Sequence, residues 1–451
     1  MNENLTLEIK YFGKIHYAKL ELNKINVIGG INSSGKSTAS KLLYCFLKAN
    51  SLKRLDYVKE EAIPLMNTII NIVANPQPYG NHGLSGAYSI DDDFLEILDA
   101  YKKAKKEYKK IKHLFAIDFV FDQKIKRADG LIRIVLDEYN DYSVPIFKLI
   151  WENESLSSFK GISNLYGDFF RCSIINGEDH YYKELRYNYE QYMDDEFEKF
   201  NDSEGYYSSH GNFSFLTDVF YLDSFSIFDM KFQDPRYMEH IQYLTDNLRN
   251  TDDEVVKNIE SVQEKINSII SGQFNSANNE FSFVPEKGYS ILKVSEGGDE
   301  NTIPKSISTE NTSSGIKQIG VIQLLLANHK LKPGTFLVID EPEVNLHPEW
   351  QFKFAEILVL LAKELDVIVY LNSHSPMFIE SIDAFSEYYD FGDSINFYLT
   401  HESNVKGEYS FKRVKNDELY RIYDNLGRPY DLIDQLRLKK HMGDLNGSFN
   451  Q

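Results

Sequence analysis

The sequence has few cysteines and no long apolar run. Cys45 and Cys172 are the only cysteines among 451 residues, which excludes a disulfide framework, and they have neither zinc-ligand spacing nor an obvious catalytic partner. No apolar run approaches the roughly 18 residues that cross a bilayer, and the first residues lack the basic and apolar segments of a signal peptide. We therefore expect a cytoplasmic protein that makes no membrane contact.

Basic residues are also in the minority. The chain has 49 Lys and Arg against 68 Asp and Glu, a formal net charge of -19, so any DNA contact has to be concentrated in a local track. A composition of 42% hydrophobic and 26% charged residues is typical of globular proteins and excludes wholesale disorder. The length predicts about three domains, or one large domain with a long insertion.

A Gly-rich turn near the N-terminus is the strongest motif. Residues 5–11 and 18–28 are predicted strands, and the second leads into Gly30–Ser37, which fits GxxxxGK(S/T) and precedes a predicted helix. In such a loop the backbone N–H groups surround phosphate oxygens, the lysine bridges the β- and γ-phosphates, and the serine ligates magnesium. The predicted ATP contacts here are Gly30, Asn32, Ser33, Ser34, Gly35, Lys36, Ser37 and Thr38.

A P-loop site needs an acidic strand end to hold magnesium and to polarise water. Residues 336–341 supply one far along the chain, as an apolar run that ends in two acids. Two carboxylates at the end of a buried strand are costly unless they have a role. We therefore predict that Asp340 binds Mg²⁺ together with Ser37, and that Glu341 is the general base.

A strand–helix–strand unit extends this site. Residues 348–365 are a predicted helix and residues 367–371 a predicted strand. Parallel strands joined in this way end on the same edge of their sheet. His374, which follows the second strand, is therefore expected near Glu341, in contact with the γ-phosphate.

A serine-rich helix start precedes the acidic strand. Ser313 or Ser314 suits the N-cap of the predicted helix, and hydroxyls with free N–H groups at a helix start form an anion site. Alone, this pattern more often indicates plain helix capping. Its order and spacing relative to the P-loop and the acidic strand favour ATP contacts from Ser313, Ser314 and Gly315.

Together these motifs resemble ABC-type ATPases of the branch that includes the SMC, RecF and OLD-family proteins. The P-loop is GINSSGKS, NTSSGIKQ stands where those proteins have LSGGQ, and the acid pair and histidine lie in LVIDEPEVNLHPEWQ and LNSHSP. The motifs DEPE, LHP and SHSP are similar to those of the OLD-like group. The resemblance implies an α/β fold, an ABC-type P-loop ATPase head with a mainly parallel sheet.

The resemblance also implies an assembly. The P-loop of one subunit and the Ser313–Gly315 signature of the other would enclose each ATP in a head-to-tail homodimer, with a higher oligomer left open. Asn345, Leu346 and His347 would then lie near the dimer interface. No glutamine can be assigned to a Q-loop.

The segment after His374 is short and shows no second cluster of acids with metal-site spacing, unlike the Toprim domain of OLD nucleases. The chain therefore resembles the stand-alone ATPase subunits of anti-phage systems, PtuA of Septu and AriA of PARIS. These act with a separately encoded HNH or Toprim nuclease. The expected protein hydrolyses ATP with Mg²⁺, senses infection and controls such an effector. Alternatives are a RecF/SMC-like DNA repair clamp and a protein that holds ATP as a structural ligand.

The expected domains follow these motifs. Residues 1–90 form the N-terminal part of the ATPase head, residues 91–214 an insertion with one helical arm and a Tyr-rich segment, residues 215–400 the rest of the head with a second arm, and residues 401–451 a C-terminal extension. Three-and-four spacing of apolar residues within 94–115 and 255–269 predicts a short hairpin of two helical arms.

The first predicted arm is rich in lysine. Seven lysines lie between Lys102 and Lys112, all outside the apolar seam. They suit a DNA-binding face, which needs concentrated positive charge, a docking face for an acidic partner, or an ordinary solvated helix face.

Overall fold

The computed structural model divides into two compact units, one of residues 1–51 with 147–451 and one of residues 52–146. No helix in the part of the chain that it describes is long and apolar enough to cross a membrane. The described residues are 5–51, 54–74, 94–111, 124–132, 170–176, 181–187, 206–210, 215–223, 228, 239–252, 256, 259–277, 280–285, 307–309, 312–415, 418–422, 424, 426 and 433–438.

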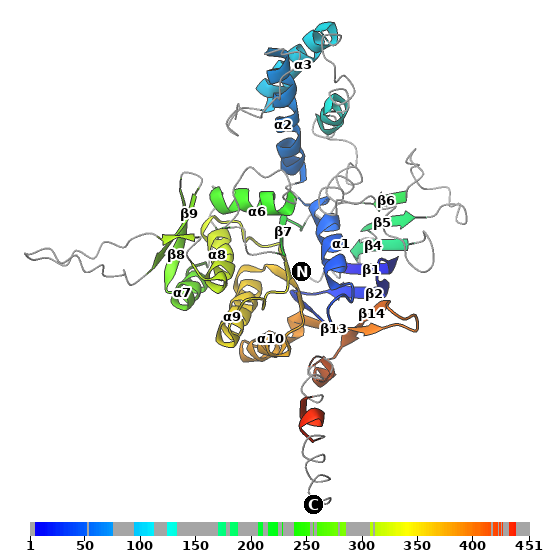
Figure 1. Cartoon of the computed structure of the whole chain (residues 1–451), viewed down its shortest axis with the longest axis vertical. Helices are drawn as coiled ribbons and strands as arrows, with labels where there is room; N and C mark the ends of the chain where they lie inside the picture. Colours follow the sequence, from blue (N-terminus) through cyan, green and yellow to red (C-terminus); the bar gives the residue numbers. More distant parts are fainter. Residues whose placement is uncertain are drawn as a thin grey trace, which may run out of the picture. The chain divides into compact units, whose positions relative to one another are not determined.

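The larger unit is built on one large sheet, in which the described residues form 11 strands in the order β6-β5-β4-β1-β2-β14-β13-β3-β12-β11-β7 (Figure 1). The five strands from β13 to β7 are parallel. The other pairs are antiparallel except β14 with β2. The α/β fold is thus confirmed, with the P-loop strand in its parallel half. The strands are β1 (Leu5–Phe12), β2 (Ile15–Leu22), β3 (Ile25–Gly29), β4 (Phe170–Asn176), β5 (Tyr181–Tyr187), β6 (Tyr206–His210), β7 (Asp218–Leu222), β11 (Thr335–Asp340), β12 (Ile368–Ser373), β13 (Ile395–Glu402) and β14 (Tyr409–Val414).

Helices cover both faces of the parallel strands. Successive side chains of a strand point to opposite faces, and in β11 Leu337 and Ile339 belong to the apolar core formed with α7, α8, α9 and α10. The alternate residues Phe336 and Val338 are buried toward the other face, where α1 contacts β7, β11 and β12. The helices of this unit include α1 (Lys36–Lys48), α6 (Glu239–Arg249), α7 (Ile259–Ile270), α8 (Ser314–Ala327), α9 (Pro348–Leu365) and α10 (Pro376–Tyr388). A second sheet has the order β10-β9-β8, with β8 (Gly272–Ala277), β9 (Glu280–Pro285) and β10 (Ile307–Ser308).

The smaller unit contains α2 (Arg54–Ala74), α3 (Phe94–Ile111) and a helical segment over residues 124–132. Helices α2 and α3 contact each other. The hydroxyl of Tyr101 in α3 donates to Asp129 at 2.8 Å, and Lys105 forms an ion pair with the same carboxylate. The inserted unit therefore has its own packed core.

The pairing predicted for the two helical arms is wrong. Residues 94–111 form α3, which packs on α2, whereas residues 259–270 form α7, which contacts α8 and α9. Val262 and Ile266 of α7 are fully buried in the main core. Apolar spacing identifies the face that a helix buries but not the element that covers it, so the periodicity could not identify the partner of either helix.

The strand predicted over residues 18–28 is divided into β2 and β3. The backbone N–H of Asn23 donates to the Asn26 side chain at 2.8 Å, and the Asn26 amide donates back to the Asn23 carbonyl at 2.7 Å. Such local side-chain bonds compete with strand pairing. The break leaves β3 as a short, fully buried strand that ends at the P-loop.

The region 91–214 contributes to both units. Strands β4, β5 and β6 continue the large sheet beside β1, while α3 belongs to the smaller unit. The domain boundaries at residues 90, 214 and 400 stay a prediction. Residues 188–205, in the Tyr-rich part of this region, lie outside the described residues.

Candidate active site

The P-loop joins β3 to α1 and has a backbone that few residues tolerate. Ser33 and Gly35 have φ values of 61° and 92°, in the left-handed region. A Cβ at Gly35 would lie 2.7 Å from Cγ1 of Ile15, and one at Gly30 would lie 1.9 Å from Oγ1 of Thr400. The two glycines of the motif therefore let the loop lie directly against β2 and β13.

Lys36 begins α1 and is almost completely buried, with 5% of its surface exposed. Its ammonium donates to the backbone carbonyl oxygens of Gly30 and Ile31, both at 2.8 Å. Burial lowers the pKa of Lys36, while the charges of Glu341, Glu343 and Asp340 oppose that shift. The lysine is thus held inside its own loop and lies within the field of the acidic strand end.

The remaining P-loop residues differ in accessibility. Asn32, Ser33 and Ser37 are exposed and Thr38 is half-buried. Ser34 is buried, donates to the Ile31 carbonyl at 2.8 Å and accepts from Thr400 at 3.0 Å. The exposed hydroxyls and amide therefore lie on the open side of the loop.

Asp340 ends β11, and its carboxylate is surrounded by donors. Ser40 of α1 donates to Oδ1 and Tyr221 of β7 donates to Oδ2, both at 2.8 Å, and the Asn372 amide donates to Oδ1. Burial raises the pKa of Asp340, against these bonds and one from Ser37. The predicted magnesium pair, Ser37 and Asp340, therefore lies close enough for the serine hydroxyl to lower the pKa of the carboxyl.

Glu341 and His374 lie beside this buried pair. Glu341 follows β11 with φ 52°, and its N–H donates to the Asn372 carbonyl at 3.0 Å. His374 follows β12, and its Nδ1 lies 3.7 Å from Oε1 of Glu341. The parallel pairing of β11 with β12 brings the two side chains together.

The signature-like segment forms the start of α8. Ser313 is the N-cap and accepts from the Ile316 N–H at 3.4 Å, and both Ser313 and Ser314 are exposed. A Cβ at Gly315 would lie 3.0 Å from Leu346, so this helix start lies beside the loop that follows Glu341. The buried Gln318 reinforces that contact by donating to the Pro342 carbonyl at 2.6 Å.

A protein family matches most of the chain, and its description agrees with the nucleotide-binding geometry. A protein family described as an AAA ATPase domain matches residues 5–379. The chain belongs to this family. No curated protein matches the chain.

Several solved structures resemble this ATPase at a distance. The SMC head domain from Thermotoga maritima is 12% identical, with a TM-score of 0.37, over 92% of this chain and 100% of that chain. An Smc head domain with an extended coiled coil bound to the C-terminal domain of ScpA, derived from Pyrococcus furiosus, is 10% identical, with a TM-score of 0.38, over 96% and 98%. An SmcHead bound to the C-winged helix domain of ScpA is 10% identical, with a TM-score of 0.42, over 92% and 98%. The family assignment rests on the match over residues 5–379.

The residues of the ATPase site fit a nucleotide and a divalent cation. Gly35 is the N-cap of α1 and offers no side-chain cap, so the first N–H groups of the helix can face phosphate oxygens, and Lys36 supplies a cation at the helix start. Ser37 and Asp340 are oxygen ligands of the kind that Mg²⁺ prefers. Among the described residues no cluster of three or more His, Cys, Asp or Glu could hold a metal ion.

Sequence analysis missed several residues of this ATPase site. Glu343, two positions after the predicted base, is buried and accepts hydrogen bonds from the loop that carries His374. The repeated acid in DEPE was the available signal. Ser40, Tyr221 and Asn372 surround Asp340, and only the pairing of distant strands brings them together.

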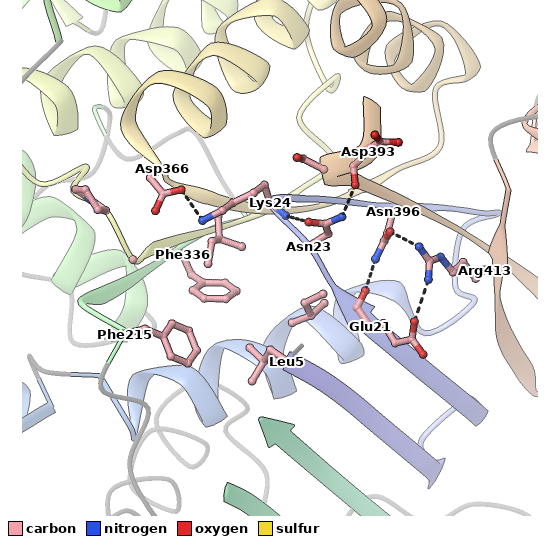
Figure 2. A pocket seen from close by; sticks show the side chains of 15 residues that line it. Leu5, Glu21, Asn23, Lys24, Phe215, Phe336, Asp366, Asp393, Asn396 and Arg413 are labelled. Carbon is pink, nitrogen blue, oxygen red and sulfur yellow. Dashed lines mark hydrogen bonds and ion pairs between the residues drawn. The ribbon is translucent and has the colours of Figure 1, made fainter. Parts of the chain in front are cut away.

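A separate pocket of about 590 Å³ lies where the parallel strands begin, at the opposite ends from the P-loop (Figure 2). Lys24 forms an ion pair with Asp366 at 2.5 Å, and Arg413 contacts Glu21 at 2.9 Å and Asn396 at 2.6 Å. Leu5, Phe215 and Phe336 supply its apolar side. This pocket contains none of the predicted ATP contacts.

Proposed function

We propose that this chain is the ATP-hydrolysing subunit of a bacterial anti-phage defence complex in the cytoplasm. Two copies enclose MgATP between their heads, and the state of this dimer controls a separately encoded nuclease of the HNH or Toprim type. The family match supports the ATPase domain. The resemblance to OLD-like ATPases in DEPE, LHP and SHSP supports the defence role.

A difference in burial between Asp340 and its neighbours Glu341 and His374 is the observation that supports the dimer proposal. Asp340 is 6% exposed, whereas the side chains of Glu341 and His374 are 41% and 38% exposed. A reaction that must exclude bulk water needs its general base covered at the moment of hydrolysis. A second copy that presents Ser313–Gly315 covers these two residues and completes the site.

Each residue then has a defined role. Lys36 exchanges its carbonyl acceptors for oxygens of the β- and γ-phosphates, and Ser37 with Asp340 holds Mg²⁺, which neutralises developing charge on the phosphates when it is bound. Glu341 accepts the proton of the attacking water. His374 contacts the γ-phosphate and so distinguishes ATP from ADP.

Glu341→Gln tests this assignment. The amide keeps the shape of the side chain but cannot accept the proton, so turnover should fall about 100- to 10,000-fold while ATP binding persists. The bound ATP should then stabilise the dimer, measured by light scattering after size-exclusion chromatography with MgATP. Lys36→Ala is the matched control and should stay monomeric. A Glu341→Gln protein with undiminished turnover and no dimer contradicts the proposal.

The effector is tested by recovery of the tagged protein from its own cells with MgATP present, followed by mass spectrometry. A stoichiometric nuclease supports the defence complex. Its absence, with repair proteins recovered instead, supports the clamp described next.

A DNA clamp of RecF/SMC type is the second candidate, and α3 favours it. Lys102, Lys103 and Lys106 are exposed on this helix, and only Lys103 has a described partner among these three, Asp99 at 2.6 Å. Replacement of all three by Gln should weaken DNA binding and reduce the dependence of affinity on salt. Lys105, which is paired with Asp129, provides the control. DNA affinity that does not change with salt eliminates the clamp.

A further inference from the structure

Glu343 connects the two strand ends that carry Glu341 and His374. Its side chain is 5% exposed, and its Oε1 accepts from Ser373 Oγ at 2.8 Å, from the His374 N–H at 2.7 Å and from the Ser375 N–H at 3.0 Å. Three donors from consecutive residues thus meet at one oxygen. The carboxylate fixes the backbone of the histidine loop to the loop that follows β11.

The same oxygen also lies near the histidine ring. His374 Nδ1 is 3.2 Å from Glu343 Oε1, closer than it is to Glu341, at 3.7 Å. The other oxygen of Glu343, Oε2, is buried and has no hydrogen-bond partner in the structure. One carboxylate oxygen therefore makes the described contacts with both the backbone and the ring of His374.

The connection continues toward the signature segment. The Ser375 hydroxyl donates to the Gln351 side chain at 2.9 Å, and the Gln351 amide donates to the Leu346 carbonyl at 3.1 Å. Leu346 in turn lies beside Gly315 at the start of α8. A chain of contacts thus runs from the predicted γ-phosphate contact to the segment that the proposed dimer brings to its partner.

We infer that Glu343 is a positioning residue for ATP hydrolysis, which holds His374 against the γ-phosphate and transmits its position through Gln351 to the signature segment. This inference rests on the proposed function for the role of His374. Glu343 does not touch the reacting atoms. It orients the group that does, as outer residues of other sites orient their ligands.

Turnover of single and double variants tests the inference. Glu343→Ala should lower kcat about 10- to 100-fold and leave the KM for ATP within about twofold. If Glu343 acts through His374, the double variant Glu343→Ala/His374→Ala should be no slower than His374→Ala alone. If the fold losses in kcat of the two single variants multiply in the double variant, the inference is wrong, because the two residues then act independently.

A conservative variant separates hydrogen bonding from charge. In Glu343→Gln the amide oxygen can replace Oε1 and accept the same donors, so at least about half of the wild-type kcat should return. Glu380→Gln, on the exposed surface of α10, is the matched control and should leave kcat unchanged. A Gln variant as slow as the Ala variant overturns the positioning role, since charge alone would then account for the effect.

Amide hydrogen exchange provides a readout without nucleotide. Glu343→Ala removes the acceptor of the His374 and Ser375 N–H groups, so exchange in a peptide that contains them should accelerate about 10-fold or more, and Glu343→Gln should restore protection. Unchanged exchange overturns the inference whatever the turnover. Absence of turnover in the wild-type protein, with exchange altered as expected, refutes the proposed hydrolysis instead, so the two failures are distinguishable.

Discussion

The candidate site has a buried half, with Lys36 and Asp340, and an open half, with Glu341 and His374, and the two halves differ in how far contacts within the chain enclose them. In the buried half, Lys36 and Asp340 have all their described partners within the chain: two carbonyl oxygens for the lysine, and donors from α1, β7 and β12 for the carboxylate. In the open half, Glu341 and His374 retain about two fifths of their side-chain surface. The buried half is fixed by contacts within the chain, whereas the open half is the part that the proposed dimer would cover.

Because of this difference, we expect the buried half to determine ATP affinity and the open half to determine turnover. Preorganised groups lose little freedom when a ligand arrives, so they contribute to affinity. Groups that are completed only in an assembled state contribute to the chemical step, because only interactions realised in the transition state raise kcat. Variants of the two halves should therefore have different kinetic signatures.

Within the buried half, the largest effect is expected from Lys36→Ala. Loss of the cation that we propose contacts the phosphates should reduce kcat/KM about 1000-fold and weaken nucleotide binding. Both are measured by phosphate release and by titration with a fluorescent ATP analogue. Lys41→Ala, on the same helix, is the control. If Lys36→Ala still binds ATP with wild-type affinity, the comparison is wrong, since the buried half would then not determine affinity.

His374→Ala should affect the open half alone. Loss of a contact to the γ-phosphate should lower kcat about 100-fold while ATP affinity stays within about threefold. Single-turnover and equilibrium-binding measurements separate the two quantities. Equal losses in affinity and in kcat would show that the open half is preorganised in the free protein.

The buried half could be predicted only in part from the sequence. Gly30–Ser37 and Asp340 stand out because local chemistry requires them: tight turns need glycine, and acids rarely end buried strands without a role. Tyr221 and Ser40 gave no such signal. They become neighbours of Asp340 only because β7 pairs with β11 and α1 contacts β11.

The helices show the same limit at the level of the fold. Periodicity predicted that 94–115 and 255–269 contain amphipathic helices, and α3 and α7 confirm this. It could not tell that α7 covers the main core while α3 packs on α2. A residue pattern specifies what a segment must bury, but long-range pairing decides where.

Tyr221→Phe tests the buried half more finely. It removes one donor from Asp340, at 2.8 Å, and should cost about 1–2 kcal/mol of unfolding free energy and weaken the dependence of ATP binding on Mg²⁺. Tyr398→Phe is the matched control, because that buried tyrosine donates to the Glu21 carbonyl at 2.9 Å, beside the opposite pocket. It should lower stability by a similar amount without changing the magnesium dependence. Identical behaviour of the two variants means that Tyr221 supports only folding.

Asp383→Asn should have the smallest effect and extends the comparison to a carboxylate outside the site. Burial, with the charges of Glu387 and Glu380 on the same helix, raises the pKa of Asp383 to about 6. The folded protein therefore binds this proton more tightly than the unfolded chain, so stability falls as pH rises from about 4 to 6, and the full cost is present at pH 7. Since this site is partly exposed, screening reduces the expected gain for Asp383→Asn to about 1 kcal/mol at pH 7.

Thermal unfolding of Asp383→Asn at pH 4 and pH 7 measures this gain. The variant should be more stable than wild type at pH 7 and equal to it at pH 4, with Asp390→Asn in the exposed turn after α10 as control. A gain of the same size at both values of pH would assign the effect to packing rather than charge. Turnover should be unchanged, because Asp383 is a half-buried carboxylate of α10 that takes no part in the candidate site.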